Sequence, residues 1–218
     1  MINDYECGGQ YLRRIETEDG RIGWYAYEPL RWEVIEEDDE SMLLLCTSVI
    51  DYMPMNPRTE TQKHRCDGDY TYVIDSNTYA NVFYGSYLDM WLNCVLLPDA
   101  FKEEEKSRLI PYEVPIRLRA QGYGDAYSSR IGYEKKILIP GEEQLKGLPP
   151  EDRKPSDHAA HLGAKDDFWL IDKLDDYDTG DDAYVGIAMH TARGSRPAHL
   201  KEVQEHCGVV PMIRVKKG

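Results

Sequence analysis

Residues 29–35 read PLRWEVI and residues 42–46 read MLLLC, and the acidic run EEDDE fills positions 36–40 between them. Residues 30–35 of the first stretch alternate apolar and polar side chains, which predicts a strand with one buried face. The second stretch is a continuous apolar run, which predicts a strand buried on both faces. Five adjacent acids repel one another and favour a solvated loop. The three segments together predict a β-hairpin.

The flanking segments differ on the two sides of this hairpin. Toward the N-terminus, residues 11–15 and 24–27 are strand candidates separated by the turn-like sequence EDG at residues 18–20, so they predict a further hairpin. Toward the C-terminus, residues 53–76 contain two prolines and a glycine among many polar side chains. That composition predicts a long irregular connection.

Two helices are predicted in the middle of the chain. The first covers residues 87–96, because Ser86 precedes apolar positions at helical spacing and an acid follows it three residues later, as in a capping box. Pro98 should end this helix, since a proline interrupts the backbone hydrogen bonds. Asp99 is placed to cap a second helix over residues 100–110.

The second half of the chain supplies one helical turn at residues 142–146 and strand candidates at residues 137–139, 168–171, 184–189 and 209–215. Strands and helices are segregated, without a repeating βαβ rhythm. This favours an α+β fold with a mainly antiparallel sheet, two principal helices and a loop-rich C-terminal third. A length of 218 residues is suited to a single domain over residues 1–218.

Charge excludes some classes of partner. Forty acidic against 26 basic residues give a formal net charge of −14, which repels nucleic acid phosphates and anionic lipid, so direct nucleic-acid binding is not expected. No apolar run approaches the ~18 residues that a membrane span requires, so membrane insertion is not expected either. An acidic surface keeps a protein soluble. It is also suited to binding cations, to facing a basic partner, or to imitating nucleic acid toward a DNA-binding protein.

The five cysteines, Cys7, Cys46, Cys66, Cys94 and Cys207, are odd in number and include no CxxC pair. This pattern argues against a disulfide framework, and the apolar neighbours of Cys46 and Cys94 are typical of small buried thiols. Reduced thiols, together with an N-terminus that shows no export signal, predict a cytoplasmic protein. The alternative is an extracellular protein with a Cys7–Cys207 bridge and a removed export signal.

Short motifs occur in a fixed order along residues 9–216: PLRWEVI and MLLLC as quoted, YLDMWLN at 87–93, AF at 100–101 with Glu105 and Leu109-Ile110, KILI at 136–139, FWL at 168–170, AYV at 183–185 and GVVPMI at 208–213. In this order the chain resembles a bacterial family of domains of unknown function, number 6273. It departs from the family's pattern at Val210 and at Ile171-Asp172, where the family usually carries an arginine.

The layout also resembles, more loosely, the fold of the C-type lectins and the formylglycine-generating enzymes. This likeness implies ligand-facing loops between Trp169 and Val209 and a pairing of the N- and C-terminal strands. The formylglycine-generating enzymes use a cysteine pair near the C-terminus. Only Cys207 lies in the last third of this chain, so that activity is not implied.

An acidic loop is the candidate metal site. Its proposed ligands are the aspartates Asp172, Asp176, Asp178, Asp181 and Asp182. Hard oxygen ligands on a loop are suited to Ca²⁺, although the spacing is not that of an EF-hand. The alternative is a solvated acidic loop that keeps a sheet edge from pairing with other chains.

A zinc or catalytic site would require histidine and cysteine side chains to meet. His158 and His161 are spaced for one face of a helical turn, and His206 and Cys207 are further candidate ligands. The HExxH motif of zinc proteases is absent, and no catalytic residue is assigned. Surface histidines are the alternative interpretation.

The ligand-binding candidates are Trp169, Tyr177, Arg193 and Arg196, of which Trp169 and Tyr177 flank the acidic loop. Aromatic side chains supply rigid contact area for sugar rings or protein surfaces, although core packing is the alternative for Trp169. The leading hypothesis is a non-enzymatic binding domain that presents residues 172–206 to a glycan or protein. The alternatives are an acidic phage or mobile-element protein that blocks a nucleic-acid-binding partner, and an enzyme with a His/Cys site.

Overall fold

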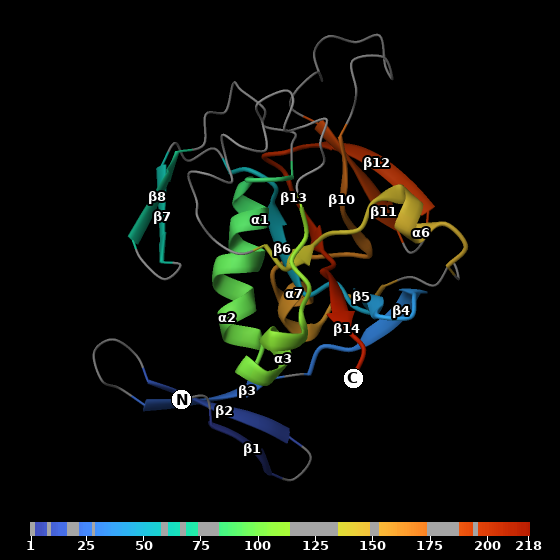
Figure 1. The fold of residues 1–218 in the computed structure, drawn as a ribbon. Coiled ribbons are helices and arrows are strands. Elements are labelled where there is room, and N and C mark those ends of the chain that lie inside the picture. Colours follow the sequence, from blue (N-terminus) through green and yellow to red (C-terminus); the bar gives the residue numbers. More distant parts are fainter. Residues whose placement is uncertain are drawn as a thin grey trace, which may run out of the picture. The chain divides into compact units, whose positions relative to one another are not determined.

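The computed structural model describes residues 3–7, 10–16, 22–27, 29–57, 61–65, 69–73, 83–113, 135–148, 153–173, 188–193 and 196–218 (Figure 1). Its contacts divide the chain into two compact units, Met1–Arg31 and Trp32–Gly218. The expectation of one domain over residues 1–218 stays a prediction, and the two units are described separately.

The first unit is a three-stranded antiparallel sheet in the order β1-β2-β3. Its strands are β1 (Asn3–Cys7), β2 (Gln10–Glu16) and β3 (Ile22–Tyr27). β2 and β3 pair in antiparallel register from Tyr11 opposite Tyr27 to Glu16 opposite Ile22. The hairpin predicted from residues 11–15 and 24–27 is therefore confirmed.

The second unit holds two larger sheets and a separate hairpin. The four-stranded sheet has the order β4-β5-β14-β9, formed by β4 (Trp32–Glu37), β5 (Ser41–Cys46), β9 (Ile137–Leu138) and β14 (Met212–Lys216). The five-stranded sheet has the order β12-β11-β10-β13-β6, formed by β6 (Asp51–Pro54), β10 (Asp167–Lys173), β11 (Ala188–Arg193), β12 (Arg196–Glu202) and β13 (His206–Val209).

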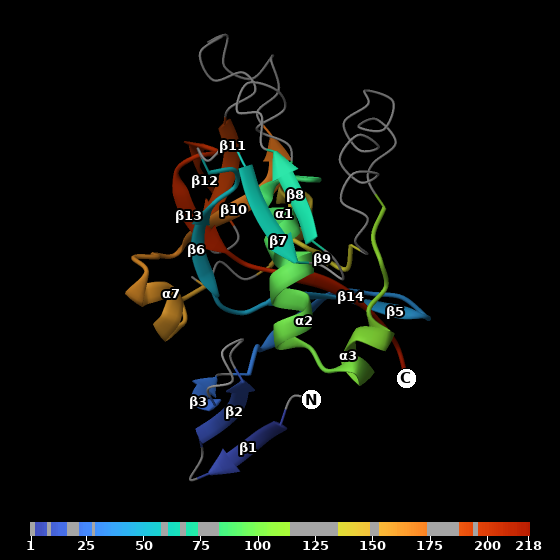
Figure 2. The same cartoon turned by 90° about the vertical axis from the view of Figure 1, so that its left-hand side faces the viewer.

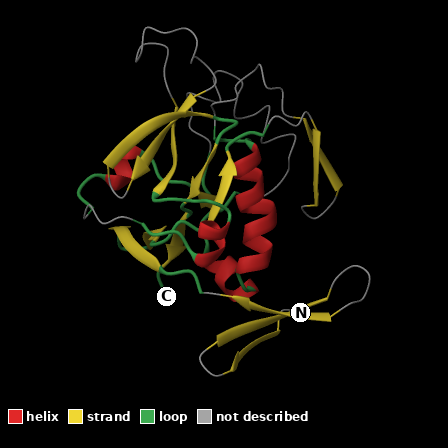
Figure 3. Ribbon diagram, turned by 180° about the vertical axis from the view of Figure 1, so that it is seen from behind, coloured by secondary structure: helices red, strands yellow, loops and turns green. Residues whose placement is uncertain are grey.

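Pairing in these sheets is antiparallel except between β10 and β13, which run parallel. Figure 3 shows the helical column of this unit beside its strands. The α+β class with mainly antiparallel sheets is therefore confirmed.

The predicted hairpin of residues 30–35 and 42–46 is β4 and β5. Leu43 and Leu45 are buried, whereas Met42 and Leu44 are half-buried, so only one face of β5 is fully covered. The pairing slips between Val34 and Glu36, because one extra residue of β4 bulges out of register. A bulge of this kind changes the face on which the following side chains lie.

A continuous helical column replaces the first predicted helix. It consists of α1 (Tyr87–Trp91), the π-helical turn η1 (Leu92–Leu96) and α2 (Leu97–Ala100). The predicted cap is confirmed, because the Ser86 hydroxyl accepts the backbone N–H of Asp89 at 3.1 Å. The prediction that Pro98 ends the helix is wrong. Pro98 is the second residue of α2 and follows the π-helical turn, which interrupts the regular ladder of backbone hydrogen bonds, so the column continues through the proline.

The second predicted helix is shorter than expected. Only α3 (Glu103–Arg108) is helical, and Lys102, not Asp99, is its N-cap residue. Phe101 between α2 and α3 has extended backbone angles of −109° and 135°, and its side chain is buried. The ring lies 6.2 Å from that of Trp32. Burial of Phe101 therefore outweighs the helical preference of the surrounding residues.

Residues 53–76, predicted as an irregular connection, contain regular structure. β6 covers the start of the segment and pairs with β13 from the far end of the chain. β7 (Thr61–Arg65) and β8 (Asp69–Val73) form an antiparallel hairpin, and β7 contacts the π-helical turn (Figure 2). The prediction overlooks the alternation of polar and aromatic side chains in β8 (DYTYV), and β7 (TQKHR) has no apolar side chain that could indicate a strand.

Two short helices and a break in the last predicted strand complete the unit. The helices are α6 (Glu142–Leu145) and α7 (Asp157–His161), and α6 confirms the predicted helical turn. The strand predicted over residues 209–215 is divided into β13 and β14 at Val210 and Pro211. Proline has no N–H for a sheet ladder, and here the chain passes from the five-stranded to the four-stranded sheet.

The core of the second unit lies where the two sheets meet the helical column. Its largest fully buried side chains are Trp169, Phe83, Phe168, Leu45, Met55, Leu88, Met90, Leu92, Ile137, Ile139, Leu170 and Met189. Within the described part of the chain, no helix combines the length and apolarity that crossing a bilayer would need.

Candidate functional site

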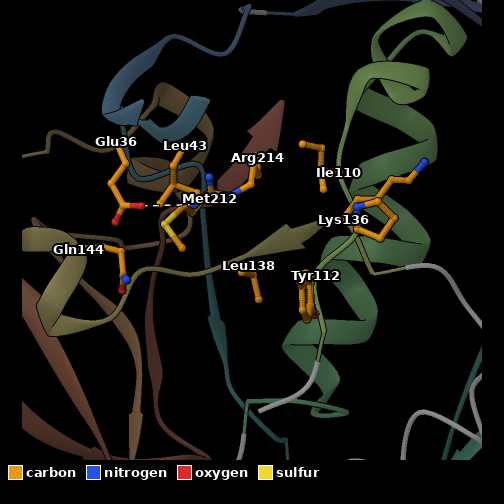
Figure 4. A pocket seen from close by; sticks show the side chains of 10 residues that line it. Glu36, Leu43, Ile110, Tyr112, Lys136, Leu138, Gln144, Met212 and Arg214 are labelled. Atoms are coloured by element: carbon orange, nitrogen blue, oxygen red, sulfur yellow. Dashed lines mark hydrogen bonds and ion pairs between the residues drawn. The ribbon is translucent and has the colours of Figure 1, made fainter. Parts of the chain in front are cut away.

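A pocket of about 230 Å³ opens on the four-stranded sheet (Figure 4). Its lining residues come from β4, β5, β9 and the residue before it, β14, α6 and the segment after α3: Glu36, Leu43, Ile110, Pro111, Tyr112, Lys136, Leu138, Gln144, Met212 and Arg214. Figure 4 shows Leu138 and Met212 between two sides of the pocket, with Glu36 and Gln144 on one side and Ile110 and Tyr112 on the other. The lining is therefore mainly aliphatic, with charged and polar groups around it.

The floor of the pocket is one face of the sheet. Glu36 and Arg214 both lie opposite Leu43, so these three residues form one row across β4, β5 and β14. Met212 and Leu138 lie opposite each other on the neighbouring strands β14 and β9. Regular alternation along β4 would have put Ile35 opposite Leu43. The bulge replaces that apolar residue with the carboxylate of Glu36.

Arg214 is the cation of this row, and its guanidinium is held by three groups. Nη2 lies 3.2 Å from Oε2 of Glu36, and Nη1 lies 3.0 Å from the hydroxyl of Ser41 and 3.5 Å from Oδ2 of Asp38. The Asp38 carboxylate also accepts the backbone N–H groups of Glu40 and Ser41 and the Ser41 hydroxyl. The bonds from Glu40 and Ser41, helped by the charge of Arg214, lower the pKa of Asp38.

The wall opposite Glu36 is tied to β14 and to the helical column. The backbone N–H of Ile110 donates to the carbonyl of Arg214 at 2.8 Å, which holds the chain after α3 against the sheet. The hydroxyl of Tyr112 donates to Oδ1 of Asp89 at 2.6 Å. Asp89 is fully buried in α1, so this wall is anchored in the core.

Asn93 is the second anchor of the wall, and its side chain is only 5% exposed. Its amide oxygen accepts the backbone N–H groups of Lys136 at 2.7 Å and Ile137 at 2.8 Å, and its amide nitrogen donates to the carbonyl of Ile137 and to Asp89. Nearby, Nζ of Lys135 lies 3.9 Å from Oδ2 of Asp89. Burial lowers the pKa of Lys135, and the charge of Asp89 opposes this effect.

Lys136 lines the pocket with its hydrocarbon chain, while Nζ donates to the carbonyl of Lys106 in α3 at 3.2 Å. The cation nearest the floor is therefore Arg214. The lining residues offer a carboxylate, a guanidinium, an amide and a phenol around an aliphatic floor. Such a lining is suited to holding a small molecule that has both an apolar body and polar groups.

The ligand-binding candidates from the sequence lie elsewhere. Trp169 in β10 is 0% exposed, and its indole N–H donates to the carbonyl of Met53 at 2.8 Å, so it is a core residue and offers no surface for stacking. Arg193 is half-exposed and pairs with Asp166 at 3.0 Å, and Arg196 is exposed at the start of β12. Tyr177 lies outside the described residues.

Of the calcium candidates, only Asp172 lies within the described residues; Asp176, Asp178, Asp181 and Asp182 lie outside them. The Asp172 carboxylate accepts the backbone N–H of Glu142 at 2.7 Å and so caps the start of α6 from β10. In the described ranges, no three His, Cys, Asp or Glu side chains gather in a group that could hold a metal ion. The calcium site stays a prediction.

The histidine and cysteine candidates do not line the pocket. His158 and His161 are exposed on α7, and Nε2 of His158 lies 3.6 Å from Oδ2 of Asp51. His206 is exposed, whereas its neighbour Cys207 is buried. Burial, with the adjacent charge of Asp167, raises the pKa of the Cys207 thiol. A thiol held in its neutral form is a poor nucleophile and a poor metal ligand.

The cysteines differ from the sequence expectations in two respects. Cys46 and Cys207 are free and buried, so the predicted alternative of a Cys7–Cys207 bridge is wrong for this structure. Cys94, however, forms a disulfide bond. The interpretation of Cys94 as a reduced thiol is therefore wrong, because disulfide pairing depends on which residues approach in the folded chain and not on their spacing in the sequence.

Sequence reasoning missed the residues that build the pocket. The run of acids at residues 36–40 predicts a solvated loop at Glu36, and Arg214 and Tyr112 belong to no motif. A partial signal was present, because Met212 and Arg214 are two residues apart in a predicted strand and so share one face. No family model matches this chain, no curated protein matches it, and no solved structure matches it.

Proposed function

We propose that this protein is a non-enzymatic binding domain and that the pocket on the four-stranded sheet is one of its ligand sites. The proposal keeps the lectin-like binding role inferred from the sequence but places a binding site away from residues 172–206, of which 174–187 and 194–195 lie outside the described residues. In the described residues β14 pairs with β5 and β9 and not with the first strand of either unit, so the lectin-like fold stays part of this proposal on the resemblance of the sequence alone.

The observation that carries the proposal is that the polar groups of the pocket are held in place before any ligand arrives. Arg214 is oriented by Glu36, Asp38 and Ser41, and Tyr112 is oriented by Asp89. Groups that are already oriented lose little conformational entropy on binding. A small aliphatic floor with a few fixed polar groups is the usual composition of a ligand site.

The disulfide bond of Cys94 bears on where such binding would take place. Disulfides persist in oxidising compartments and are rare in the cytosol. We therefore propose an extracellular setting for this domain, with Cys94 and not Cys207 in a disulfide bond.

The test of the proposal is a ligand screen with a pocket-filling variant. The full chain is screened by saturation-transfer NMR against free amino acids, monosaccharides and di- and tripeptides. Leu138→Trp would fill the floor of the pocket, because Leu138 lies next to Met212. Val34→Trp is the matched control, since Val34 is 51% exposed on β4 and lines no part of the pocket.

Compounds that bind the wild type and Val34→Trp but not Leu138→Trp would support the proposal. Binding that Leu138→Trp leaves unchanged would place the site elsewhere and refute it. A screen in which no compound binds the wild type would also refute it. Both variants are first checked for a cooperative thermal transition, so that loss of folding is not mistaken for loss of binding.

A further inference from the structure

We infer that the pocket binds a free aliphatic α-amino acid as its zwitterion, with the ammonium at Glu36, the carboxylate at Arg214 and the side chain on the floor. This inference rests on the proposed function and adds the chemical class of the ligand.

The opposite charges of Glu36 and Arg214 favour a dipolar ligand. Glu36 and Arg214 stand side by side, with Oε2 of Glu36 3.2 Å from Nη2 of Arg214. A carboxylate has two oxygens, so Glu36 keeps acceptor capacity for an ammonium. A guanidinium has five N–H groups, and in the described residues three of them contact Glu36, Asp38 and Ser41, which leaves two donors for a carboxylate.

The overall charge argues against a purely anionic ligand. The chain carries a formal net charge of −14, which repels anions at long range. A zwitterion has no net charge and avoids this repulsion. Its ammonium would contact Glu36, and its carboxylate would contact Arg214. A purely cationic ligand would be attracted by Glu36 but would leave the donors of Arg214 unused.

The floor and the volume set the size and polarity of the ligand body. Leu43, Leu138 and Met212 provide an aliphatic surface beside the charged pair, and Ile110 closes one side. The volume of about 230 Å³ lies below the range of roughly 300–1,000 Å³ typical of sites for drug-sized ligands. A sugar ring would leave its hydroxyl groups facing these aliphatic side chains. A short branched aliphatic side chain matches both the small volume of the pocket and the aliphatic character of its floor.

Calorimetry with the full chain tests the ligand class, with L-leucine as the probe. Three compounds each remove one part of leucine: 4-methylpentanoate lacks the ammonium, 3-methylbutylamine lacks the carboxylate, and glycine lacks the side chain. Each should bind about tenfold or more weakly than leucine, because each leaves a charged group or the floor without its partner. The dipeptide Leu-Gly distinguishes a free amino acid from a chain end, and it should also bind more weakly.

Variants assign the two ends of the ligand. Glu36→Gln should weaken leucine and 3-methylbutylamine by about tenfold but leave 4-methylpentanoate unchanged. Arg214→Gln should show the reverse pattern. Arg193→Gln is the matched control, because Arg193 also forms a half-exposed ion pair, with Asp166, and lines no part of the pocket. It should bind leucine like the wild type.

The possible failures are distinguishable. If 4-methylpentanoate or Leu-Gly binds as tightly as leucine, or if Glu36→Gln keeps the affinity for leucine, the inferred class is wrong while the pocket remains a binding site. If leucine does not bind but other compounds of the screen depend on Leu138, the inference fails and the proposed function stands. If no compound binds, both fail.

Discussion

The hydroxyl of Tyr112 donates a hydrogen bond to Oδ1 of Asp89 over 2.6 Å and so connects the wall of the pocket to a fully buried carboxylate in α1. Asp89 accepts further bonds at the start of the helical column, from the backbone N–H of Gly85 at 2.7 Å and from the side chain of Asn93 at 2.9 Å. The Tyr112 side chain is therefore held in position by a buried carboxylate and not by surface residues.

Removal of the Tyr112 hydroxyl should destabilise the protein. Tyr112→Phe takes one donor away from the buried Asp89 carboxylate, and a hydrogen bond to a charged group is worth about 1.5–3 kcal/mol. Urea unfolding measures this loss. Tyr52→Phe is the control, since the Tyr52 ring packs against His206 and its hydroxyl forms no hydrogen bond within the described part of the chain. A loss of equal size in both variants would contradict the role of Asp89.

Asn93→Ala should have a larger effect. Its side chain satisfies the backbone N–H groups of Lys136 and Ile137 and the carbonyl of Ile137. The variant removes these three hydrogen bonds, and a buried group that loses such a bond costs about 1–3 kcal/mol. We expect the free energy of unfolding to fall by about 3 kcal/mol or more. Amide hydrogen exchange should also speed up at Lys136 and Ile137, and unchanged protection there would contradict this account.

The pair of Asp167 and Lys201 should contribute a pH-dependent part of the stability. Nζ of Lys201 lies 2.8 Å from Oδ2 of Asp167. Burial alone raises the pKa of Asp167, but the hydrogen bond and charge of Lys201 outweigh it and hold this pKa below 3.8. A carboxyl with a lowered folded-state pKa adds stability above about pH 3.8, and that stability is lost as the pH falls through the folded-state pKa.

The effect on Lys201 has the opposite sign. Burial lowers its pKa, but the bond to Asp167 outweighs this and raises the pKa above 10.5. Its contribution is therefore complete below about pH 10.5 and is lost as the pH rises further. Asp167→Asn should reduce the free energy of unfolding near neutral pH and flatten both its acid and its alkaline decline. Urea unfolding across the pH range measures this, and an unchanged acid slope would refute the assignment.

The free thiols of Cys46 and Cys207 should be inert in the folded protein. Burial raises the pKa of Cys46 to about 11, and burial with the charge of Asp167 raises that of Cys207 further. Since the thiolate is the reactive form, iodoacetamide at about pH 8 should modify neither residue until the chain is unfolded. Peptide mass mapping measures the modification. Rapid labelling of folded Cys207 would instead revive the hypothesis of a His/Cys enzyme.

Calcium binding by the acidic loop is tested by thermal unfolding with millimolar Ca²⁺ and with excess chelator. A site filled at about 100 times its dissociation constant adds ~2.7 kcal/mol. Asp172→Ala should lower stability by about 1 kcal/mol in both conditions, because it removes the cap of α6. The double variant Asp176→Asn/Asp178→Asn should lose any calcium response. A response that survives in the double variant would refute the predicted ligands.

Local patterns were sufficient for the elements whose signals lie within a few residues. Alternation and an apolar run predicted the β4–β5 hairpin, and Ser86 predicted the start of α1. The same reasoning failed at Pro98 and over residues 53–76. There the outcome depends on a π-helical turn and on pairing between β6 and β13, segments more than 150 residues apart.

The α+β class, the acidic surface and the positions of most strands follow from the sequence alone, because strand alternation and capping are local properties. The pocket does not follow from it. A one-residue bulge puts Glu36 on the face of Arg214 and Leu43, and strand pairing from the far end of the chain brings Arg214 there. A shift of one residue exchanges the two faces of a strand, so only the tertiary structure could decide which side chains meet.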